Sequence, residues 1–194
     1  THSFRIQRFL SLLQIFNKPI MMKLIININE IIKNQVKEYF KDHKKVIGIA
    51  IGAGGQDKIY SVDKYIQIAD YLINKGYKIA FILGPNELNK FDLLKDKFPN
   101  QLYPLQELFQ DNEFKYSIKI TIEISNYLEF VILNDGGTSH IFALTDIHMY
   151  LILKFYHKTY LPNTSNLTTI ISDDLGYKNL NDLPVNQIIS KIKL

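Results

Sequence analysis

Four residues that could contact a polar ligand lie close together in the C-terminal half of the chain, namely Asp135, Gly136, Gly137 and His140. Paired glycines let a backbone turn tightly and approach a ligand closely. The acid and the imidazole beside them offer hydrogen bonds to a polar ligand. The segment therefore predicts a binding-site turn, although an ordinary loop in which Asp135 only caps the next helix fits it equally well.

The residues around this turn predict the elements that position it. Phe130 to Leu133 form a run of four apolar residues, which favours a strand buried on both faces, as in parallel sheets. After the glycines we expect a helix over 138–144, which Thr138 or Ser139 can cap. The free N–H groups of that helix would favour a phosphate, so strand, turn and helix together predict an anion-binding cradle.

A second glycine-rich turn follows a predicted strand over 46–51. It carries Gly52, Gly54, Gly55 and Lys58, so that backbone amides and one ammonium group could surround a diphosphate. The spacing is neither that of the dinucleotide-binding glycine motif nor that of a Walker A loop. Lys58 by itself also fits an ordinary solvated surface lysine.

A third turn runs from Gly84 to Glu87. The Glu87 carboxylate could accept hydrogen bonds from both hydroxyls of a ribose, although an acid in the first turn of a helix is equally expected from the helix dipole. In open parallel sheets ligands bind beyond the carboxyl ends of the strands. We therefore expect the turns after Ile51, Leu83 and Leu133 to share one rim.

Strand and helix patterns alternate from residue 46 to residue 194. Strands are predicted over 46–51, 77–83, 102–105, 130–133, 149–155 and 168–171. Helices are predicted over 62–75, 87–98, 118–127, 138–144 and 185–192, with Ser61 and Gly76 as the cap residues of the first. Segment 118–127 also alternates as a strand would, but the parallel strand after it needs a crossover. The pattern predicts an α/β fold, a Rossmann-like parallel sheet with helices on both faces.

Residues 1–45 have a different pattern and are expected to lead into this sheet domain. An amphipathic helix is predicted around 9–16, and Pro19 ends it. A second helix is predicted over 28–40, whose inward side chains would be Ile31, Ile32, Val36, Tyr39 and Phe40. The predicted division is thus a helical segment over 1–45 and an α/β domain over 46–194.

Composition limits the classes of function. The 194 residues suit one globular domain, and the absence of cysteine excludes disulfides and thiolate metal sites, which is compatible with a reducing cytoplasm. The formal net charge of +4 comes from scattered lysines, without a basic stripe interleaved with aromatic residues. This favours small phosphorylated ligands or an anionic membrane surface over nucleic acid. No apolar run approaches the roughly 20 residues that span a bilayer.

The sequence contains no further catalytic or metal motif. Around His140 there is no His or carboxylate at the spacing of metal ligands, and no nucleophile elbow of the hydrolase type is present. We therefore expect no metal and no cofactor.

Three segments, in order along the chain, carry a resemblance to a known family: Gly48 to Gly55 with Lys58, Gly84 to Glu87, and Asn134 to His140. Together they resemble the C-terminal half of the ADP-heptose lipopolysaccharide heptosyltransferase family, which is glycosyltransferase family 9. The resemblance covers 46–142 and, more loosely, 183–194. Residues 3–16 resemble the segment that leads out of the family's N-terminal domain.

The resemblance implies the GT-B architecture, in which two Rossmann-like domains face each other. The C-terminal domain binds the donor nucleotide-sugar, here an ADP-heptose-like molecule, and the N-terminal domain binds the lipopolysaccharide core acceptor. Residues 1–45 would then be a helical linker from a missing N-terminal domain, and 46–194 the nucleotide-sugar-binding domain. Such enzymes invert the anomeric centre, and their general base is an acid of the N-terminal domain, which no residue of this chain can match. The implied location is cytoplasmic, with peripheral association at the inner face of the inner membrane.

The donor site implied by the resemblance comprises Gly54, Gly55, Lys58, Glu87, Asp135, Gly136, Gly137, Thr138 and His140. In it Lys58 would meet the diphosphate or sugar, Glu87 the ribose, and Asp135 the heptose hydroxyls. The glycines and adjacent amides would contact the phosphates, with His140 beside them.

Two departures from the family pattern leave an alternative open. Gly136 stands where the family usually has Ser or Thr, and after His140 the family's Gly-x-Pro turn is replaced by a segment from Thr145 to His148. The alternative is a degenerate, non-catalytic nucleotide-binding or assembly module.

Overall fold

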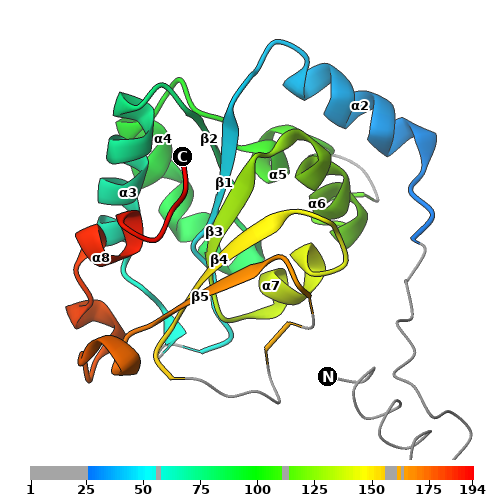
Figure 1. Cartoon of the computed structure of the whole chain (residues 1–194). Coiled ribbons are helices and arrows are strands. Elements are labelled where there is room, and N and C mark those ends of the chain that lie inside the picture. The colour runs from blue at the N-terminus through cyan, green and yellow to red at the C-terminus, as the bar shows by residue number, and fades with distance from the viewer. Residues whose placement is uncertain (1–25, 56–57, 111–113, 156–160, 163) are drawn as a thin grey trace, which may run out of the picture.

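The computed structural model describes residues 26–55, 58–110, 114–155, 161–162 and 164–194. At its centre lies a five-stranded sheet of order β2-β1-β3-β4-β5 in which every neighbouring pair runs parallel (Figure 1). The strands are β1 Val46–Ala50, β2 Lys78–Phe81, β3 Phe130–Asn134, β4 His148–Leu153 and β5 Leu167–Ile171. The predicted α/β fold with a Rossmann-like parallel sheet is confirmed.

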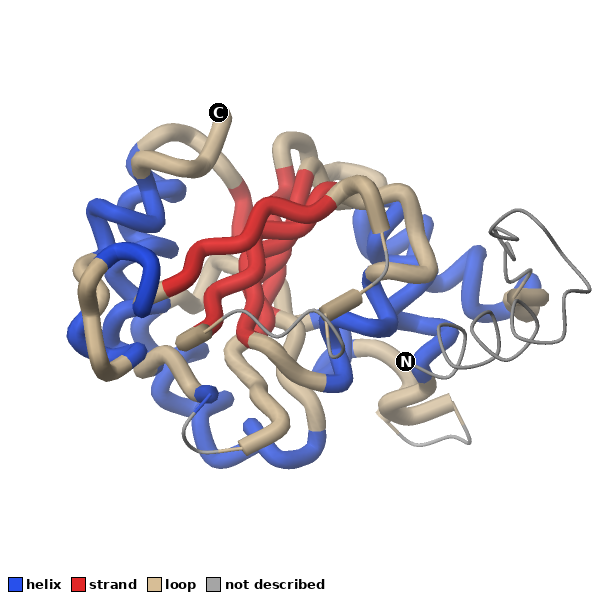
Figure 2. The backbone as a smooth tube through the Cα atoms, turned by 60° about the horizontal axis from the view of Figure 1, so that its bottom comes forward, coloured by secondary structure: helices blue, strands red, loops and turns tan. Residues whose placement is uncertain are grey.

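Helices cover both faces of the sheet, as expected (Figures 1 and 2). One face carries α3 Val62–Asn74, α4 Phe91–Lys97 and α8 Val185–Ile189. The other carries α2 Glu30–Phe40, α5 Pro104–Glu107, α6 Ile118–Ile124 and α7 Gly137–Phe142. Short 3₁₀ turns complete the described part of the chain: η2 Pro85–Lys90, η3 Ser125–Tyr127, η4 Asp173–Leu175 and η5 Leu180–Asp182.

The strands separate two hydrophobic cores. All residues of β1 and β3 are buried, as their uninterrupted apolar runs predict. Along β1, Ile47 and Ile49 face the core under α3, whereas Val46 and Ala50 face the core under α2 and α6. Successive side chains of a strand point to opposite faces, so one short apolar segment contributes to both cores.

The helix after β1 follows its sequence pattern closely. Ser61 is the N-cap residue of α3, although its side chain makes no capping hydrogen bond. Tyr65, Ala69 and Leu72 are buried on one face of the helix. Beyond the helix Gly76 has φ +86°, the left-handed conformation that favours glycine at this position.

Several predicted boundaries and one predicted strand are wrong. Instead of a strand over 102–105 there is an isolated bridge between Ala80 and Leu102, because Pro104 then begins α5. The predicted helix 87–98 is a 3₁₀ turn, η2, followed by α4. The helical interpretation of 118–127 is confirmed by α6 and η3, so the strand alternative is wrong.

The helix predicted over 28–40 is α2, which begins at Glu30 because Asn29 caps it, accepting from the Ile31 N–H at 2.8 Å. Its buried side chains include Ile32, whereas Ile31 is 52% exposed, so the prediction that Ile31 points inward is wrong. The helix packs on α6 and shares the core of that sheet face. The helix predicted around 9–16 lies outside the described residues, and the domain boundary at residue 46 stays a prediction.

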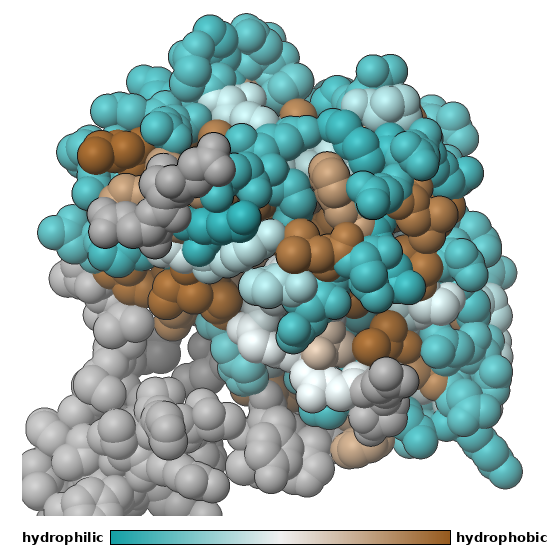
Figure 3. All heavy atoms as spheres, turned by 180° about the vertical axis from the view of Figure 1, so that it is seen from behind, coloured by the Kyte–Doolittle hydropathy of each residue, from teal (hydrophilic) through white to brown (hydrophobic). Residues whose placement is uncertain are grey.

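In the described part of the chain, none of the helices has the length and apolar character needed to cross a membrane. On the face seen in Figure 3, hydrophobic residues form small groups broken up by hydrophilic surface. Small, scattered apolar groups of this kind are usual on the surface of a globular domain.

Replacement of Ile32 by alanine is expected to lower the free energy of unfolding by about 2–5 kcal/mol, because its fully buried side chain would leave a cavity. Ile31→Ala, one residue earlier on the same helix, is the matched control, and we expect its effect to stay within about 0.5 kcal/mol. Urea denaturation measures both changes. Equal effects would contradict the packing of α2 against the core.

Candidate functional site

The sheet order brings the three predicted turns to one rim. β1 lies between β2 and β3, and the three strands run parallel, so their carboxyl ends point the same way. The chain passes from β1 to β2 on one side and then crosses back to β3 on the other side of β1. Ligands of open parallel sheets bind at such a reversal of strand order. The turns after Ile51, Leu83 and Leu133 therefore share the rim where a ligand is expected.

The first and third turns touch through their backbones. The Gly54 N–H donates to the carbonyl of Asp135 at 3.3 Å. A Cβ added at Gly136 would lie 3.0 Å from the Gly54 nitrogen and 3.1 Å from the Ala53 Cα, so a larger residue would not fit unless a backbone moved. Glycine at 136 is thus required by the close approach of two backbone segments.

Lys58 and Asp135, both predicted to meet the ligand, form an ion pair with Nζ 2.7 Å from Oδ2. The Asp135 side chain is 16% exposed and the Lys58 side chain 40%. Asp135 does not cap α7, because the N-cap residue is Gly136 and the helix has no side-chain cap bond. The interpretation of Asp135 as a simple helix cap is therefore wrong, and its carboxylate instead ties the third turn to the first.

Glu87 connects the second turn to the first. Its Oε2 accepts from the Gly84 N–H at 2.9 Å, which stabilises the start of η2. The same carboxylate lies against Gly52, where an added Cβ would be 2.7 Å from Oε1. Glu87 thus closes its own turn and at the same time faces the glycine-rich loop after β1.

The helix predicted after the paired glycines is α7, which begins at Gly137 rather than at Thr138. The prediction that Thr138 or Ser139 caps this helix is wrong, since both lie within it. The Ser139 hydroxyl instead donates to the Gly136 carbonyl at 2.7 Å. The backbone N–H groups of Gly137 and Thr138 belong to the first turn, where no carbonyl within the helix can accept from them.

His140 lies on α7 within electrostatic reach of the ion pair. Burial lowers the pKa of the His140 imidazole, while the nearby Asp135 carboxylate raises it and the Lys58 ammonium lowers it. The imidazole is therefore mainly neutral at pH 7, with one ring nitrogen able to donate and the other to accept.

Sequence reasoning gave no role to Asn134, the last residue of β3, which is buried with 1% exposure. Its Nδ2 donates to the Ile51 carbonyl at 2.7 Å, and its Oδ1 accepts from the Tyr60 N–H at 3.2 Å and from the Tyr65 hydroxyl at 2.9 Å. The side chain therefore connects the ends of β3 and β1 with the start of α3. In the sequence, this role is indicated only by the position of Asn134, a polar residue that ends an apolar strand beside a glycine turn.

The structure thus gathers Gly54, Lys58, Asp135 and Gly136 through direct contacts. Gly55 lies in the same loop, its carbonyl accepting from the Lys58 N–H at 3.1 Å. Backbone amides and one ammonium could hold an anion, and the carboxylate could accept from hydroxyl groups. Over the described residues, no group of three or more His, Cys, Asp or Glu side chains could hold a metal ion, and the expected absence of a metal stays a prediction.

Comparisons with known proteins identify the fold. No family model and no curated protein matches the sequence. The structure is similar to that of a glycosyl transferase family 9 protein from Veillonella parvula, with TM-score 0.75 and 19% identity over 94% of this chain and 56% of that chain. It is also similar to E. coli ADP-heptose lps heptosyltransferase II, with TM-score 0.64 and 16% identity over 90% of this chain and 53% of the other.

A third similar structure is E. coli heptosyltransferase WaaC with ADP-2-deoxy-2-fluoro heptose, with TM-score 0.61 and 18% identity over 77% of this chain and 42% of that chain. The chain thus spans about half the length of the solved structures that it matches. At these identities the likeness shows the fold, and this chain has the fold of one part of these transferases.

Asn134→Ala is expected to destabilise the protein by at least about 1–3 kcal/mol, because two buried donors and one buried acceptor would lose their partner. Asn179→Ala is the control, since its amide makes one exposed hydrogen bond with Asp182, and little change is expected. Thermal and urea denaturation provide the readout. A similar, small effect of both substitutions would contradict a central role for Asn134.

Gly136→Ala is expected to destabilise the protein by about 1–3 kcal/mol, because the added methyl group would push against the backbone of Ala53 and Gly54. Gly137→Ala is the matched control, because an added Cβ there meets nothing within 4 Å and alanine favours a helix. We expect this variant to be neutral or slightly stabilised in the same denaturation assay. Equal tolerance of alanine at both positions would show that the two turns do not touch in solution.

Proposed function

We propose that this chain is the donor-binding half of an inverting glycosyltransferase in the ADP-heptose lipopolysaccharide heptosyltransferase family. The observation that carries the proposal is the contact between the first and third turns. Gly54 and Gly136 meet backbone to backbone, and Lys58 pairs with Asp135 beside them, at the reversal of strand order. These positions belong to the donor site that the resemblance implies.

The proposed roles follow the chemistry of each group. Lys58 supplies the mobile positive charge, and being 40% exposed it can turn toward the diphosphate of a donor. Asp135 accepts from sugar hydroxyls, and Glu87 from ribose hydroxyls. The Gly54 N–H already donates to the Asp135 carbonyl, so the amides proposed to contact a phosphate are those of Gly137 and Thr138 in the first turn of α7.

The ion pair gives this site a property that the sequence did not suggest. Without a ligand, Lys58 and Asp135 neutralise each other, so neither charge is left unpaired at the half-buried rim. A diphosphate would compete with Asp135 for Lys58, because a phosphate offers more negative charge and more acceptor oxygens than a carboxylate. The Asp135 carboxylate would then be released to meet the sugar, so that recognition of phosphate and of sugar would be coupled.

Sugar transfer would need groups that this chain is not expected to supply. Fixed donors at the rim can stabilise the negative charge that develops on a departing nucleoside diphosphate. The acceptor and the general base, however, are assigned by the resemblance to an N-terminal domain. We therefore propose that this chain binds an ADP-heptose-like donor and transfers no sugar by itself.

The names of two similar structures support the ligand class. One similar heptosyltransferase was solved with ADP and again with ADP-2-deoxy-2-fluoro heptose. Those ligands belong to that protein, and their chemistry matches the groups gathered here, namely amides and an ammonium for phosphates and carboxylates for hydroxyls.

The glycine at 136 and the segment from Thr145 to His148 favour the second candidate, a non-catalytic module that keeps the fold.

Calorimetric titration of the chain with ADP and with ADP-heptose tests the proposal. Weak, saturable binding of both ligands is expected, because the closure of two domains that would expel water is not available to one domain. Lys58→Ala should reduce the binding free energy of both ligands by roughly 1.5 kcal/mol. This value is at the lower end for a hydrogen bond to a charged group, because Lys58 is partly exposed. Lys75→Ala, an exposed lysine that follows α3, is the control and should bind as the unmodified chain does.

Asp135→Ala separates the roles of phosphate and sugar. This substitution should lower the affinity for ADP-heptose relative to the affinity for ADP, because only the sugar-containing ligand uses the Asp135 carboxylate. ADP alone should bind equally well or more tightly, since the Lys58 ammonium no longer has an internal partner. Equal weakening of both ligands would limit Asp135 to a structural role. Failure of the unmodified chain to bind either ligand would favour the non-catalytic candidate.

A further inference from the structure

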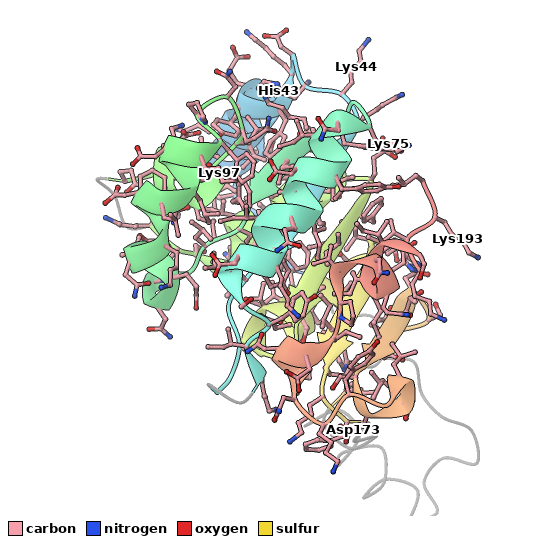
Figure 4. All side chains as sticks on the ribbon, turned by 90° about the vertical axis from the view of Figure 1, so that its left-hand side faces the viewer. His43, Lys44, Lys75, Lys97, Asp173 and Lys193 are labelled. Carbon is pink, nitrogen blue, oxygen red and sulfur yellow. The ribbon has the colours of Figure 1, made fainter. Side chains whose placement is uncertain are left out.

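The C-terminal segment 180–183 lies against the start of α3, beside the rim of the proposed donor site. It consists of η5 and Leu183, and both Leu180 and Leu183 are buried in the core under α3. In Figure 4 the C-terminal part of the chain, orange to red, lies beside the N-terminal part of α3, whereas Lys75 marks the opposite end of that helix. Two residues that are 120 positions apart in the sequence, Ser61 and Asn181, are hydrogen-bonded here.

The start of α3 receives a hydrogen-bond acceptor from this segment. Ser61 is the N-cap residue, and its N–H donates to Oδ1 of Asn181 at 2.7 Å. In a capping box the side chain three residues later would accept from this N–H. That position of α3 holds Lys64, whose ammonium can only donate. Asn181 therefore supplies the acceptor that the sequence of the helix itself lacks.

Lys64 is bound by the same segment. Its Nζ donates to the carbonyl of Asn181 and, at 2.7 Å, to the carbonyl of Leu183. A positive charge in the first turn of a helix is unfavourable because it opposes the helix dipole. The two carbonyls offset this effect, since they place partial negative charge beside the ammonium. Lys64 thus links α3 to segment 180–183.

Tyr60 is held from two sides. Its ring is fully buried, its hydroxyl donates to the Leu183 carbonyl at 2.8 Å, and its N–H donates to Asn134 Oδ1 at 3.2 Å. Burial raises the pKa of the Tyr60 hydroxyl, so the group stays protonated and donates at pH 7. Segment 180–183 and the end of β3 therefore fix this residue together.

The fixed position of Tyr60 bears on the ion pair at the rim. Lys58 lies two residues before Tyr60, and Asp135 directly follows Asn134. The distance of 2.7 Å between Lys58 Nζ and Asp135 Oδ2 therefore depends on how the segment after Lys58 is held.

We propose that Asn181 and Lys64 are positioning residues of the donor site, which hold Tyr60 and Ser61 to segment 180–183 and so place the Lys58 ammonium opposite Asp135. The effect on ligand affinity rests on the proposed function, whereas the placement of Lys58 can be tested without a ligand.

Amide hydrogen exchange of the unliganded chain, followed by NMR, tests the placement. The double variant Asn181→Ala with Lys64→Met removes three of the hydrogen bonds between segment 180–183 and α3. Exchange at Tyr60 and Ser61 should become faster, whereas exchange at Ile132 in β3 should change less. A loss of overall stability alone would affect all three amides alike, because they would then exchange through the same global opening.

The pKa of His140 is the second readout. Burial lowers this pKa, and the Lys58 ammonium lowers it further. Displacement of Lys58 in the double variant should therefore raise the pKa of His140, in the same direction as Lys58→Ala and by no more than that variant does.

Conservative substitutions at the same two positions should restore both readouts. Asn181→Asp keeps an acceptor for the Ser61 N–H, and Lys64→Arg keeps donors for the two carbonyls. Asn181→Ala alone, at an exposed position, should change the readouts in the same direction as the double variant but less strongly. A failure of the conservative pair to restore them overturns the proposal.

Asn179→Ala with Lys75→Met is the matched control, because it alters an asparagine beside the same segment and a lysine at the far end of the same helix. The Asn179 amide bonds to Asp182 rather than to α3, so exchange at Tyr60 and Ser61 should not change. Equal changes in the control and in the double variant, or no change in either, overturn the proposal.

Titration with ADP separates this inference from the proposed function. The double variant should bind ADP roughly twofold to tenfold more weakly than the unmodified chain, which is the effect of about one hydrogen bond. Unchanged ADP affinity in the double variant overturns the positioning role. If the unmodified chain itself binds no ADP, the proposed function fails, and the exchange rates and the His140 pKa still decide whether Asn181 and Lys64 place Lys58.

Discussion

One buried amide, the side chain of Asn134, holds together the rim on which every role proposed for the carboxyl ends of the strands depends. It hydrogen-bonds to the Ile51 carbonyl, the Tyr60 N–H and the Tyr65 hydroxyl, and all of these lie away from water. A polar group in such a place is stable only when its partners are present and correctly oriented. With Asn134 fixed, the next residue, Asp135, leaves the strand in one direction.

That fixed direction explains how the turns assemble. Asp135 reaches Lys58, and Gly136 lies against Gly54 because Gly136 has no side chain to hold the two backbones apart. The rim is consequently arranged before any ligand arrives, and its one positive and one negative side chain neutralise each other. A ligand with complementary charges would substitute for existing contacts, so little ordering would be required on binding.

The parallel sheet gives its two ends different chemistry. Helices that connect parallel strands run back along the sheet, so helix N-termini face the carboxyl ends of the strands and helix C-termini face the amino ends. The partial charges of the helices then favour anions at the carboxyl rim and lysines at the amino edge, where Lys75 ends α3. Lys45, Lys191 and Lys193 lie at that same edge. The glycine-rich turns and these lysines thus belong to opposite ends of one sheet.

The sequence by itself determined the parallel sheet, helix α3 and the three turns, because uninterrupted apolar runs, helical periodicity and glycines are local signals. Local signals also misled, since Pro104 begins a short helix where a strand was expected and Ile31 points to solvent. Only the tertiary structure decided that Lys58 pairs with Asp135, 77 residues away, and that Asn134 bonds to Ile51, 83 residues away. The physical reason is that periodicity specifies which side of its own element a side chain occupies, whereas its partner across the rim depends on strand order.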